Sequence, residues 1–383
     1  MSRFASSLSV HPLATHAVGE AVGDVLDGVG PLPDIAMLFV TAPLVGVLED
    51  VVGAIHKLLQ PKSLLGTTAV SVMGGAREVE EGPALALWAA SFDTGDEAAG
   101  RPIRLTASPS DGGFIIDGIP EDLSSDDTVL LLADPFSFPV DGLLRSLNER
   151  APGISLVGGL ASAARGPGGN RVILNDQLYA DGAVALVLDR STPTSTVVSQ
   201  GCRPIGDPFT VTASSGNMIE ELGGVAALDR LEALVAGATD EERALLGNGV
   251  HIGIVANEQR ATFERGDFVI RGVLGADQST RAIAIGDQPP VGSVVQFQVR
   301  DAATASEDLH LLHRSSANAE GALVFTCNGR GTQFFGSPHH DAAMLHDRTD
   351  GAALAGMFCA GEVGPIGGVN YLHGFTASTL LFH

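Results

Sequence analysis

Apolar positions follow two patterns along this chain, one typical of amphipathic helices and one typical of buried strands. In residues 12–30 they recur at helical spacing and end at glycines, which predicts an N-terminal helix. Unbroken apolar runs such as residues 35–41 and 129–133 predict strands that are buried on both faces. Residues 48–59 and 140–150 have helical periodicity and predict helices that follow these strands.

The order strand, helix, strand, glycine-rich turn, strand occurs three times, in residues 35–92, 129–188 and 322–382. Identity between the copies is low, so the repeat rests on order and pattern. Between the second and third copies, residues 217–236 predict a helix and several short strands follow. Residues 95–113 are interpreted as a loop. We therefore predict an α/β protein, with α+β as the alternative, built from three pseudo-repeated units and an inserted antiparallel β segment.

The length of the chain bears on the number of domains. A chain of 383 residues is too long for one ordinary core. We expect two interlocked domains and place their boundary where the pattern changes, near Gly223. The expected parts are the helix in 1–30, a first domain in 31–222 and a second domain in 223–383.

Charge and composition exclude several classes of protein. The formal net charge is −23, from 22 basic and 45 acidic residues, so nucleic acid and anionic membrane surfaces should be repelled. No apolar window reaches the length of a membrane span, and the N-terminus lacks the apolar core of a signal peptide. The three cysteines are widely spaced, which favours free thiols in a reducing compartment. We expect a cytoplasmic protein with no nucleic-acid partner and no membrane insertion.

Polar residues gather at the third glycine-rich turn, in the run GEVGPIGGVNYLHG at residues 361–374. Glu362, Asn370 and His373 are the candidates for ligand contact there. The first two copies have small or apolar residues near the position of Glu362, which is the asymmetry expected of a single site on a repeated scaffold. Alternatively, Glu362 caps backbone amides or pairs with an arginine.

The segment CNGRG at residues 327–331 directly follows a predicted strand. Loops at strand ends are the usual ligand sites in sheets flanked by helices, so Cys327, Asn328 and Arg330 are further candidates. Arg330 could bind a carboxylate or phosphate through two nitrogens, and the alternative is a surface arginine in a turn. Arg203 lies in a similar glycine-flanked segment and is a secondary candidate.

No catalytic residue, metal site or cofactor is predicted. Cys359, His373 and Glu362 are the residue types of a Cys–His–acid set, but Cys359 follows apolar residues and is interpreted as a core residue and secondary candidate. The histidines that begin at His339 lack the spacing of a metal site, and together with Asp341 they are interpreted as a solvated loop and helix start. Whether the protein is an enzyme stays open, and a non-enzyme is preferred.

The runs CAGEVGPIGG and LHGFTAS, with CNGRG and GCRPIG, together resemble the FIST family. The resemblance extends from about residue 32 to residue 382. It implies a small-ligand sensory module of bacterial signal transduction, with an N-terminal and a C-terminal part and ligands such as amino acids. Family members occur alone or joined to signalling domains, and a eukaryotic branch carries an F-box. We expect no attached output domain here, so the partner would be a separate signalling protein.

We therefore expect a small-ligand-binding sensory protein whose pocket lies where the loop 327–331 meets the turn 362–373. Two alternatives remain: an enzyme with a Cys/His/Glu cleft, and a protein-interaction adaptor. The enzyme would bring Cys327 or Cys359 within hydrogen-bond reach of His373, whereas the adaptor would expose a broad apolar patch.

Overall fold

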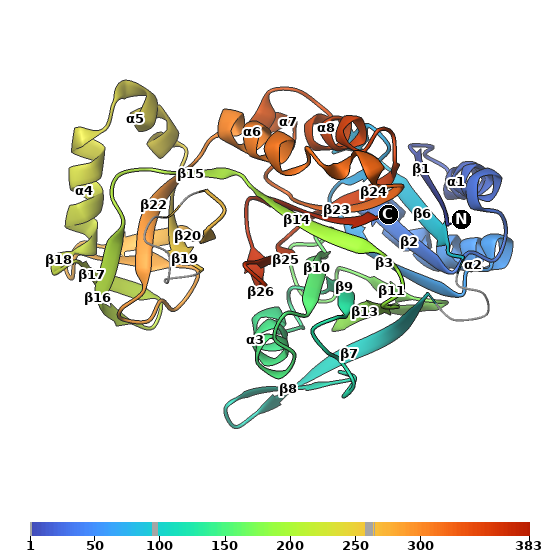
Figure 1. The fold of residues 1–383 in the computed structure, drawn as a ribbon, viewed down its shortest axis with the longest axis horizontal. Helices are drawn as coiled ribbons and strands as arrows, with labels where there is room; N and C mark the ends of the chain where they lie inside the picture. The colour runs from blue at the N-terminus through green and yellow to red at the C-terminus, as the bar shows by residue number, and fades with distance from the viewer. Residues whose placement is uncertain (1, 94–98, 257–262, 264) are drawn as a thin grey trace. The chain divides into compact units, whose positions relative to one another are not determined.

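The structure is a computed structural model that describes residues 2–93, 99–256, 263 and 265–383 (Figure 1). As predicted, the chain is a mixed α/β protein. Its residues form two compact units. The first comprises Met1–Val198, Leu309–Leu372 and Thr376–His383, and the second comprises Ser199–Asp308 and His373–Phe375. The division of the sequence into 1–30, 31–222 and 223–383 stays a prediction.

Three sheets form the first unit, and each is built around three strands with the same pairing. The first two strands are parallel, a helix lies between them in the sequence, and the third strand pairs antiparallel with the first. The sets, called here the first, second and third set, are β2 (Ile35–Thr41), β3 (Ser63–Ala69) and β6 (Leu85–Ser91); β9 (Thr128–Ala133), β10 (Ser155–Leu160) and β13 (Ala183–Leu188); and β23 (Gly321–Cys327), β24 (Ala353–Cys359) and β27 (Thr376–Phe382). Superposition of the three sets stays a prediction.

A short hairpin between the second and third strands of each set joins the sheet of another set. The hairpins are β4 (Val72–Gly74) with β5 (Arg77–Val79), β11 (Val172–Leu174) with β12 (Gln177–Tyr179), and β25 (Glu362–Ile366) with β26 (Val369–His373). They pair with β24, β3 and β10, respectively. The exchange is cyclic, because the first set extends the third, the second extends the first, and the third extends the second.

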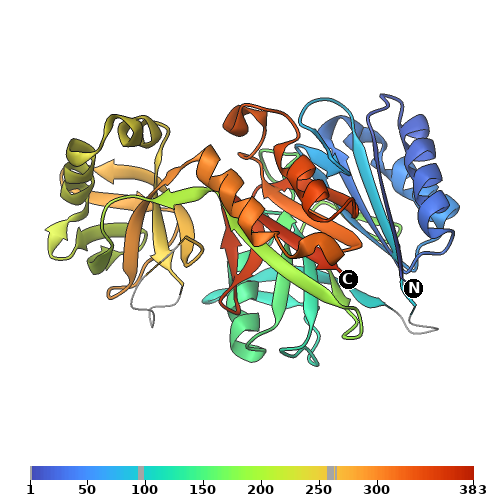
Figure 2. The ribbon, with the colours of Figure 1, turned by 45° about the horizontal axis from the view of Figure 1, so that its top comes forward.

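The inward faces of the three sheets share one apolar core, to which the sets contribute Met37, Leu132 and Phe325 among others. Helices cover the outward faces (Figures 1 and 2). They are α1 (Ala14–Val29) and α2 (Leu48–Leu59) in the first set, α3 (Val140–Arg150) in the second, and α8 (His340–Arg348) in the third. Strands that are buried on both faces need unbroken apolar runs, which is why the sequence pattern marks them so clearly.

Edge strands complete the three sheets. They are β1 (Arg3–Ser9) beside β6, β7 (Gly100–Ser110) with β8 (Gly113–Asp117) beside β13, and β14 (Thr194–Gln200) beside β27. The predicted loop at 95–113 is therefore wrong over β7, and its residues 95–98 lie outside the described residues. β7 is largely polar and partly exposed, so backbone pairing with β13 fixes it without an apolar run.

The second unit contains a closed ring of six strands. In order around the ring they are β16 (Phe209–Ser215), β17 (Met218–Leu222), β21 (Ala282–Ile285), β20 (Phe268–Asp277), β19 (Val250–Val255) and β22 (Val294–Arg300). Two short strands, β15 (Cys202–Pro204) and β18 (Val225–Ala226), pair with β22 and β17. The helices are α4 (Ala227–Gly237), α5 (Asp240–Gly247) and α6 (Ala302–Leu312), the last of which runs past the end of this unit.

The predicted helix at 217–236 is wrong over its first part. β17 occupies Met218–Leu222, and the chain then reverses at Gly223 and Gly224, whose φ angles are 58° and 73°. Two consecutive left-handed residues are incompatible with a helix and suit a tight hairpin. The helix begins only at Ala227.

Short helical turns remain at η1 (Ala42–Val47), η2 (Ser316–Asn318) and α7 (Thr332–Phe335). Within the described part of the chain, no helix has the length and apolar character needed to cross a membrane.

Candidate functional site

The parallel strands β23 and β24 end side by side at Cys327 and Cys359, which are register partners. Successive residues of a strand alternate between faces, so both thiols lie on the inward face together with Phe325. Cys359 is completely buried and Cys327 is 8% exposed. The carboxyl ends of parallel strands are the usual ligand edge of such sheets.

Glu362 begins the next strand, β25, and is completely buried. Its Oε2 accepts hydrogen bonds from the backbone N–H and the hydroxyl of Thr376, at 3.2 and 2.9 Å. Its Oε1 is buried without a hydrogen-bond partner of ordinary geometry. Burial raises the pKa of Glu362 to about 8, although Thr376, Arg330 and the Cys327 thiol act in the opposite direction. The carboxyl group is therefore mostly protonated at neutral pH.

Arg330 forms a completely buried ion pair with Asp341. Its Nε donates to Oδ2 at 2.8 Å and its Nη2 donates to Oδ1 at 3.0 Å. The Thr326 hydroxyl also donates to Oδ2, and His340 Nδ1 lies 2.9 Å from Oδ1. Burial alone would raise the pKa of Asp341, but Arg330 and these hydrogen bonds hold it well below its usual range. The guanidinium also lies over the Phe335 ring, with its central carbon 5.1 Å from the ring centre.

The sequence pattern predicts that Asp341 is solvated at the start of a helix. The helix start is correct, but the expected solvent exposure is wrong. α8 begins at His340, but Asp341 has no exposed surface. Ala342 and Leu345 dock this helix on the third sheet and carry Asp341 inside with them. A buried carboxylate needs a partner, and Arg330 supplies it. Only Nη1 of Arg330 is buried without a hydrogen-bond partner.

Glutamates from the hairpin of the first set close the other side of this site. Glu78 Oε1 accepts from the backbone N–H of Ala342, in the first turn of α8, at 2.9 Å. Glu80 Oε1 accepts from the N–H and hydroxyl of Thr332 at the start of α7, at 2.8 and 2.6 Å. Burial and the nearby Asp341 raise the pKa of Glu78 to about 7. Carboxylates at helix N-termini are a stabilising arrangement.

Sequence reasoning missed Glu78, Glu80, Asp341 and Thr376 as members of this site. The two glutamates lie 264 and 252 residues from their partners, so no local pattern marks them. Asp341 carried a usable signal, because it stands one residue before the apolar Ala342 at the start of a predicted helix.

Asn370, another predicted ligand contact, is 1% exposed and fully used by the fold. Its Nδ2 donates to Asn148 Oδ1 and to the carbonyl of Ile154, both at 2.9 Å. Its Oδ1 accepts from the backbone N–H of Leu156 at 2.8 Å. These bonds attach β26 to the second set.

Three predicted contact residues remain: Asn328, His373 and Arg203. Asn328 is exposed, and its backbone N–H donates to the carbonyl of Cys359 at 2.9 Å. His373 and Arg203 belong to the second compact unit, where His373 is buried and Arg203 pairs with Asp301 at 3.3 Å. The first unit thus brings together five side chains, called here the Glu362 cluster: Cys327, Arg330, Asp341, Cys359 and Glu362.

The corresponding strand ends of the other two sets lack such a cluster. The last register pair of the parallel strands is Cys327 with Cys359 in the third set, Thr41 with Ala69 in the first, and Ala133 with Leu160 in the second. The second set does place one buried carboxylate next to this position, Asp134, but Asn170 and Ser137 donate hydrogen bonds to its two oxygens.

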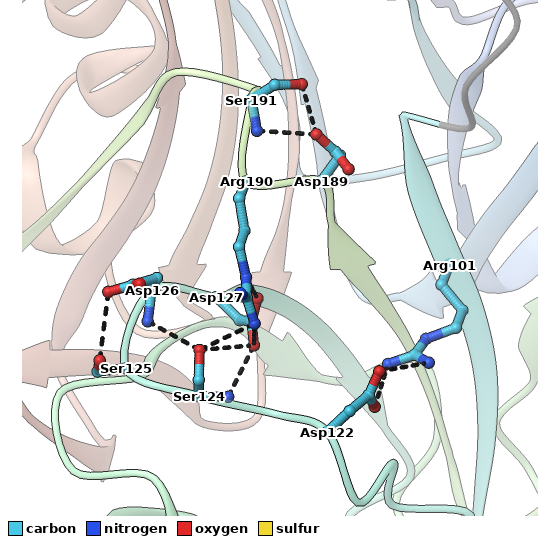
Figure 3. A network of polar contacts seen from close by, with 9 residues as sticks. All are labelled: Arg101, Asp122, Ser124, Ser125, Asp126, Asp127, Asp189, Arg190 and Ser191. Carbon is cyan, nitrogen blue, oxygen red and sulfur yellow. Dashed lines mark hydrogen bonds and ion pairs between the residues drawn. The ribbon is translucent and has the colours of Figure 1, made fainter.

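A separate surface hollow of about 580 Å³ lies at the end of β13, and none of the predicted site residues lines it. Figure 3 shows two ion pairs there, Arg190 with Asp127 at 2.7 Å and Arg101 with Asp122 at 2.8 Å. Asp127 also accepts from the backbone N–H of Ser124. Each guanidinium already has its carboxylate, so these contacts tie the turn before β9 to the sheet. Ion pairs with a solvent-exposed partner contribute little to stability.

Across the described residues, no group of three or more His, Cys, Asp or Glu side chains could hold a metal ion. All three cysteines are free thiols and all are buried.

Comparisons with known proteins agree with the resemblance of the sequence motifs. The family model of the FIST N domain matches residues 34–225, and that of the FIST C domain matches residues 227–365. The chain is 42% identical over 379 residues to the uncharacterized protein Mb0898c of Mycobacterium bovis, which covers 97% of this chain and 96% of that protein. It is 40% identical over 386 residues to the uncharacterized protein MT0656 of Mycobacterium tuberculosis, covering 99% of each. FIST domains are generally associated with sensory and signal-transduction roles. With both parts of the family matched over most of its length, the chain belongs to the FIST family.

Proposed function

We propose that this protein is a cytoplasmic sensor that binds a small metabolite at the Glu362 cluster and signals through a separate partner protein. The observation that supports it is the buried carboxyl group of Glu362, whose Oε1 has no hydrogen-bond donor beside it other than the weakly donating Cys327 thiol. A buried polar atom left in this state costs ~1–3 kcal/mol. A bound ligand that approaches Oε1 would remove this cost.

The proposed ligand is an amino acid or a similar small zwitterion. An ammonium group near Glu362 would favour the ionised carboxylate, so binding at neutral pH would release a proton. Asp341 already accepts from Nε and Nη2 of Arg330, so a ligand carboxylate would have to approach the other edge of the guanidinium, at Nη1. This nitrogen can still donate one hydrogen bond to that carboxylate.

The enzyme alternative has less support. Burial raises the pKa of the Cys359 thiol well above its usual value, so little thiolate is present at neutral pH. A non-catalytic binding site needs no thiolate. The cytoplasmic location rests on the three free cysteines, which suit a reducing compartment.

A thermal-shift screen of amino acids and related metabolites tests the proposal. Ligands that bind the folded state raise its melting temperature with concentration. We expect a stabilising ligand for the wild type and for the control Asp122→Asn, whose side chain lies in the separate hollow, but not for Glu362→Gln. Equal stabilisation of Glu362→Gln would exclude this cluster as the site. No stabilisation by any compound at millimolar concentration would exclude the ligand class.

A further inference from the structure

An apolar groove of about 390 Å³ runs between α1 and α2, on the helical layer of the first set. Val18 and Val51 line it, and three large apolar side chains beside them are open to solvent. Leu13 is 58% exposed, Leu58 is 52% exposed and Val47 is 40% exposed. Neighbouring exposed apolar side chains of this size mark interaction sites more often than isolated ones do.

Both helices contain glycines, and one of them, Gly19, lines the groove. Gly19 and Gly23 lie inside α1, and Gly53 lies inside α2. Glycine in a helix interior is destabilising relative to alanine. A Cβ added at any of these positions would meet no atom within 4 Å, so packing within this chain does not require glycine there. Gly19 itself lines the groove, where the missing side chain leaves room for an incoming backbone or side chain.

Charge decides which occupant fits. α1 and α2 together carry five carboxylates and one lysine, and the carboxylate of Asp50 lies in the wall of the groove. Glu20 and Asp24 accept hydrogen bonds from Ser9 and Ser7 of β1 and do not line it. A second copy of this chain would bring its own Asp50 to the same groove, and each chain has a net charge of −23. Like charges across an interface oppose association, whereas a basic segment is attracted.

We propose that this groove binds an amphipathic helix of a partner protein, with large apolar residues along one stripe and lysine or arginine beside it. A helix laid between two helices buries its apolar stripe against both, which is the usual helix-in-groove mode of recognition. α2 has 12 residues and is thus ~18 Å long, enough to contact about three turns of the partner. The proposal is independent of the ligand site, because it uses none of the residues of the Glu362 cluster.

The test uses two labelled helical peptides with the same leucine stripe, one flanked by lysines and its twin flanked by glutamates. Fluorescence anisotropy with the full-length protein should show the lysine peptide binding at least about tenfold more tightly than its twin. Leu58→Gln should weaken binding of the lysine peptide by about tenfold, because an exposed anchor is lost without a change of charge. The control Ile115→Gln, at a residue 55% exposed on β8, should leave binding unchanged.

Gly19→Ala separates binding from folding. The substitution should raise the melting temperature, because alanine favours the helix. It should also weaken binding of the lysine peptide, because the added methyl group enters the groove. Equal binding of the two peptides, or no binding of either, would overturn the proposal, as would unchanged affinity in both Leu58→Gln and Gly19→Ala. A dimer in sedimentation velocity that Leu58→Gln dissociates would instead assign the groove to a second copy of this chain.

Discussion

Single side chains in this protein take their properties from where the fold buries them. Glu362 and Glu78 both have raised pKa values, about 8 and about 7, because burial disfavours their charged forms. Asp341 is buried as completely as Glu362, yet Arg330 holds its pKa low. The sequence identifies Glu362 and Arg330 as candidates from their glycine-rich surroundings, but it does not show that Arg330 is already paired. That pairing depends on burial of both side chains, which no local pattern encodes.

The pKa of Glu362 predicts a dependence of stability on pH. The folded value of about 8 exceeds the ordinary value of 4.5, so between these pH values the folded state binds more protons than the unfolded state. The stability that the protonated group contributes is fully present below about pH 4.5 and is lost as the pH rises through about 8. Glutamine cannot lose a proton in this range, so Glu362→Gln does not show this loss. The free energy of unfolding of the variant, relative to that of the wild type, should therefore rise by on the order of 2–4 kcal/mol between pH 5 and pH 8.

Urea denaturation of both proteins across this pH range measures the difference. The comparison with Glu362→Gln is needed because His251 and His313 have pKa values lowered to about 4 by burial, which makes the wild type less stable as the pH falls. Both proteins contain these histidines, so their contribution to the pH dependence of stability cancels in the difference. Parallel pH profiles would contradict the protonated state of Glu362.

The Arg330–Asp341 pair predicts a strong coupling. Removing one partner leaves a buried charge alone, so Arg330→Met or Asp341→Asn should each destabilise the fold by ~3–5 kcal/mol. The double variant should be less destabilised than the sum of the two, because it leaves no charge unpaired. Chemical denaturation of the four proteins gives the coupling energy, and simple additivity would show that the two side chains do not depend on each other.

At the scale of elements, the helices and strands that pack on a core are predicted well from the sequence, and exposed ones are missed. Strands β2 and β9 and helices α2 and α3 are predicted almost residue for residue, because each presents apolar positions to a core on one or both sides. β7 is missed because backbone pairing at an exposed edge leaves little trace in hydrophobicity. β17 is missed because its residues also fit a helical period, and only the paired glycines after it mark the hairpin.

The hairpin β25–β26 offers a test at this scale, since Asn370 connects it to the second set. Asn370→Leu would leave the N–H of Leu156 and the carbonyl of Ile154 without their present partners, at a cost of ~1–3 kcal/mol for each buried group. The melting temperature should fall clearly, whereas the control Val369→Asn, at an exposed neighbour, should change it little. Equal melting temperatures of the two variants would refute this role of Asn370.

At the scale of the whole molecule, the cyclic exchange of hairpins lies beyond what the sequence predicts. The repeated order of elements is visible in the chain, but which sheet each hairpin extends depends on contacts between segments such as Val72–Gly74 and Ala353–Cys359, which are far apart in the sequence. The exchange explains how Glu78 and Glu80 reach the third set. All five side chains of the Glu362 cluster come from the third set, and the exchange pairs Glu362 itself with Gly159 of the second set.

Calorimetric titration of the wild type and Glu362→Gln, with the compound that gives the largest thermal shift, tests the central claim most directly. In the wild type we predict binding with release of a proton at pH 7, seen as a heat that varies with the ionisation enthalpy of the buffer. Glu362→Gln should bind at least about tenfold more weakly without proton release, while its unliganded melting temperature is not lowered. Equal affinity and the same heat in every buffer for both proteins would contradict a ligand site at Glu362.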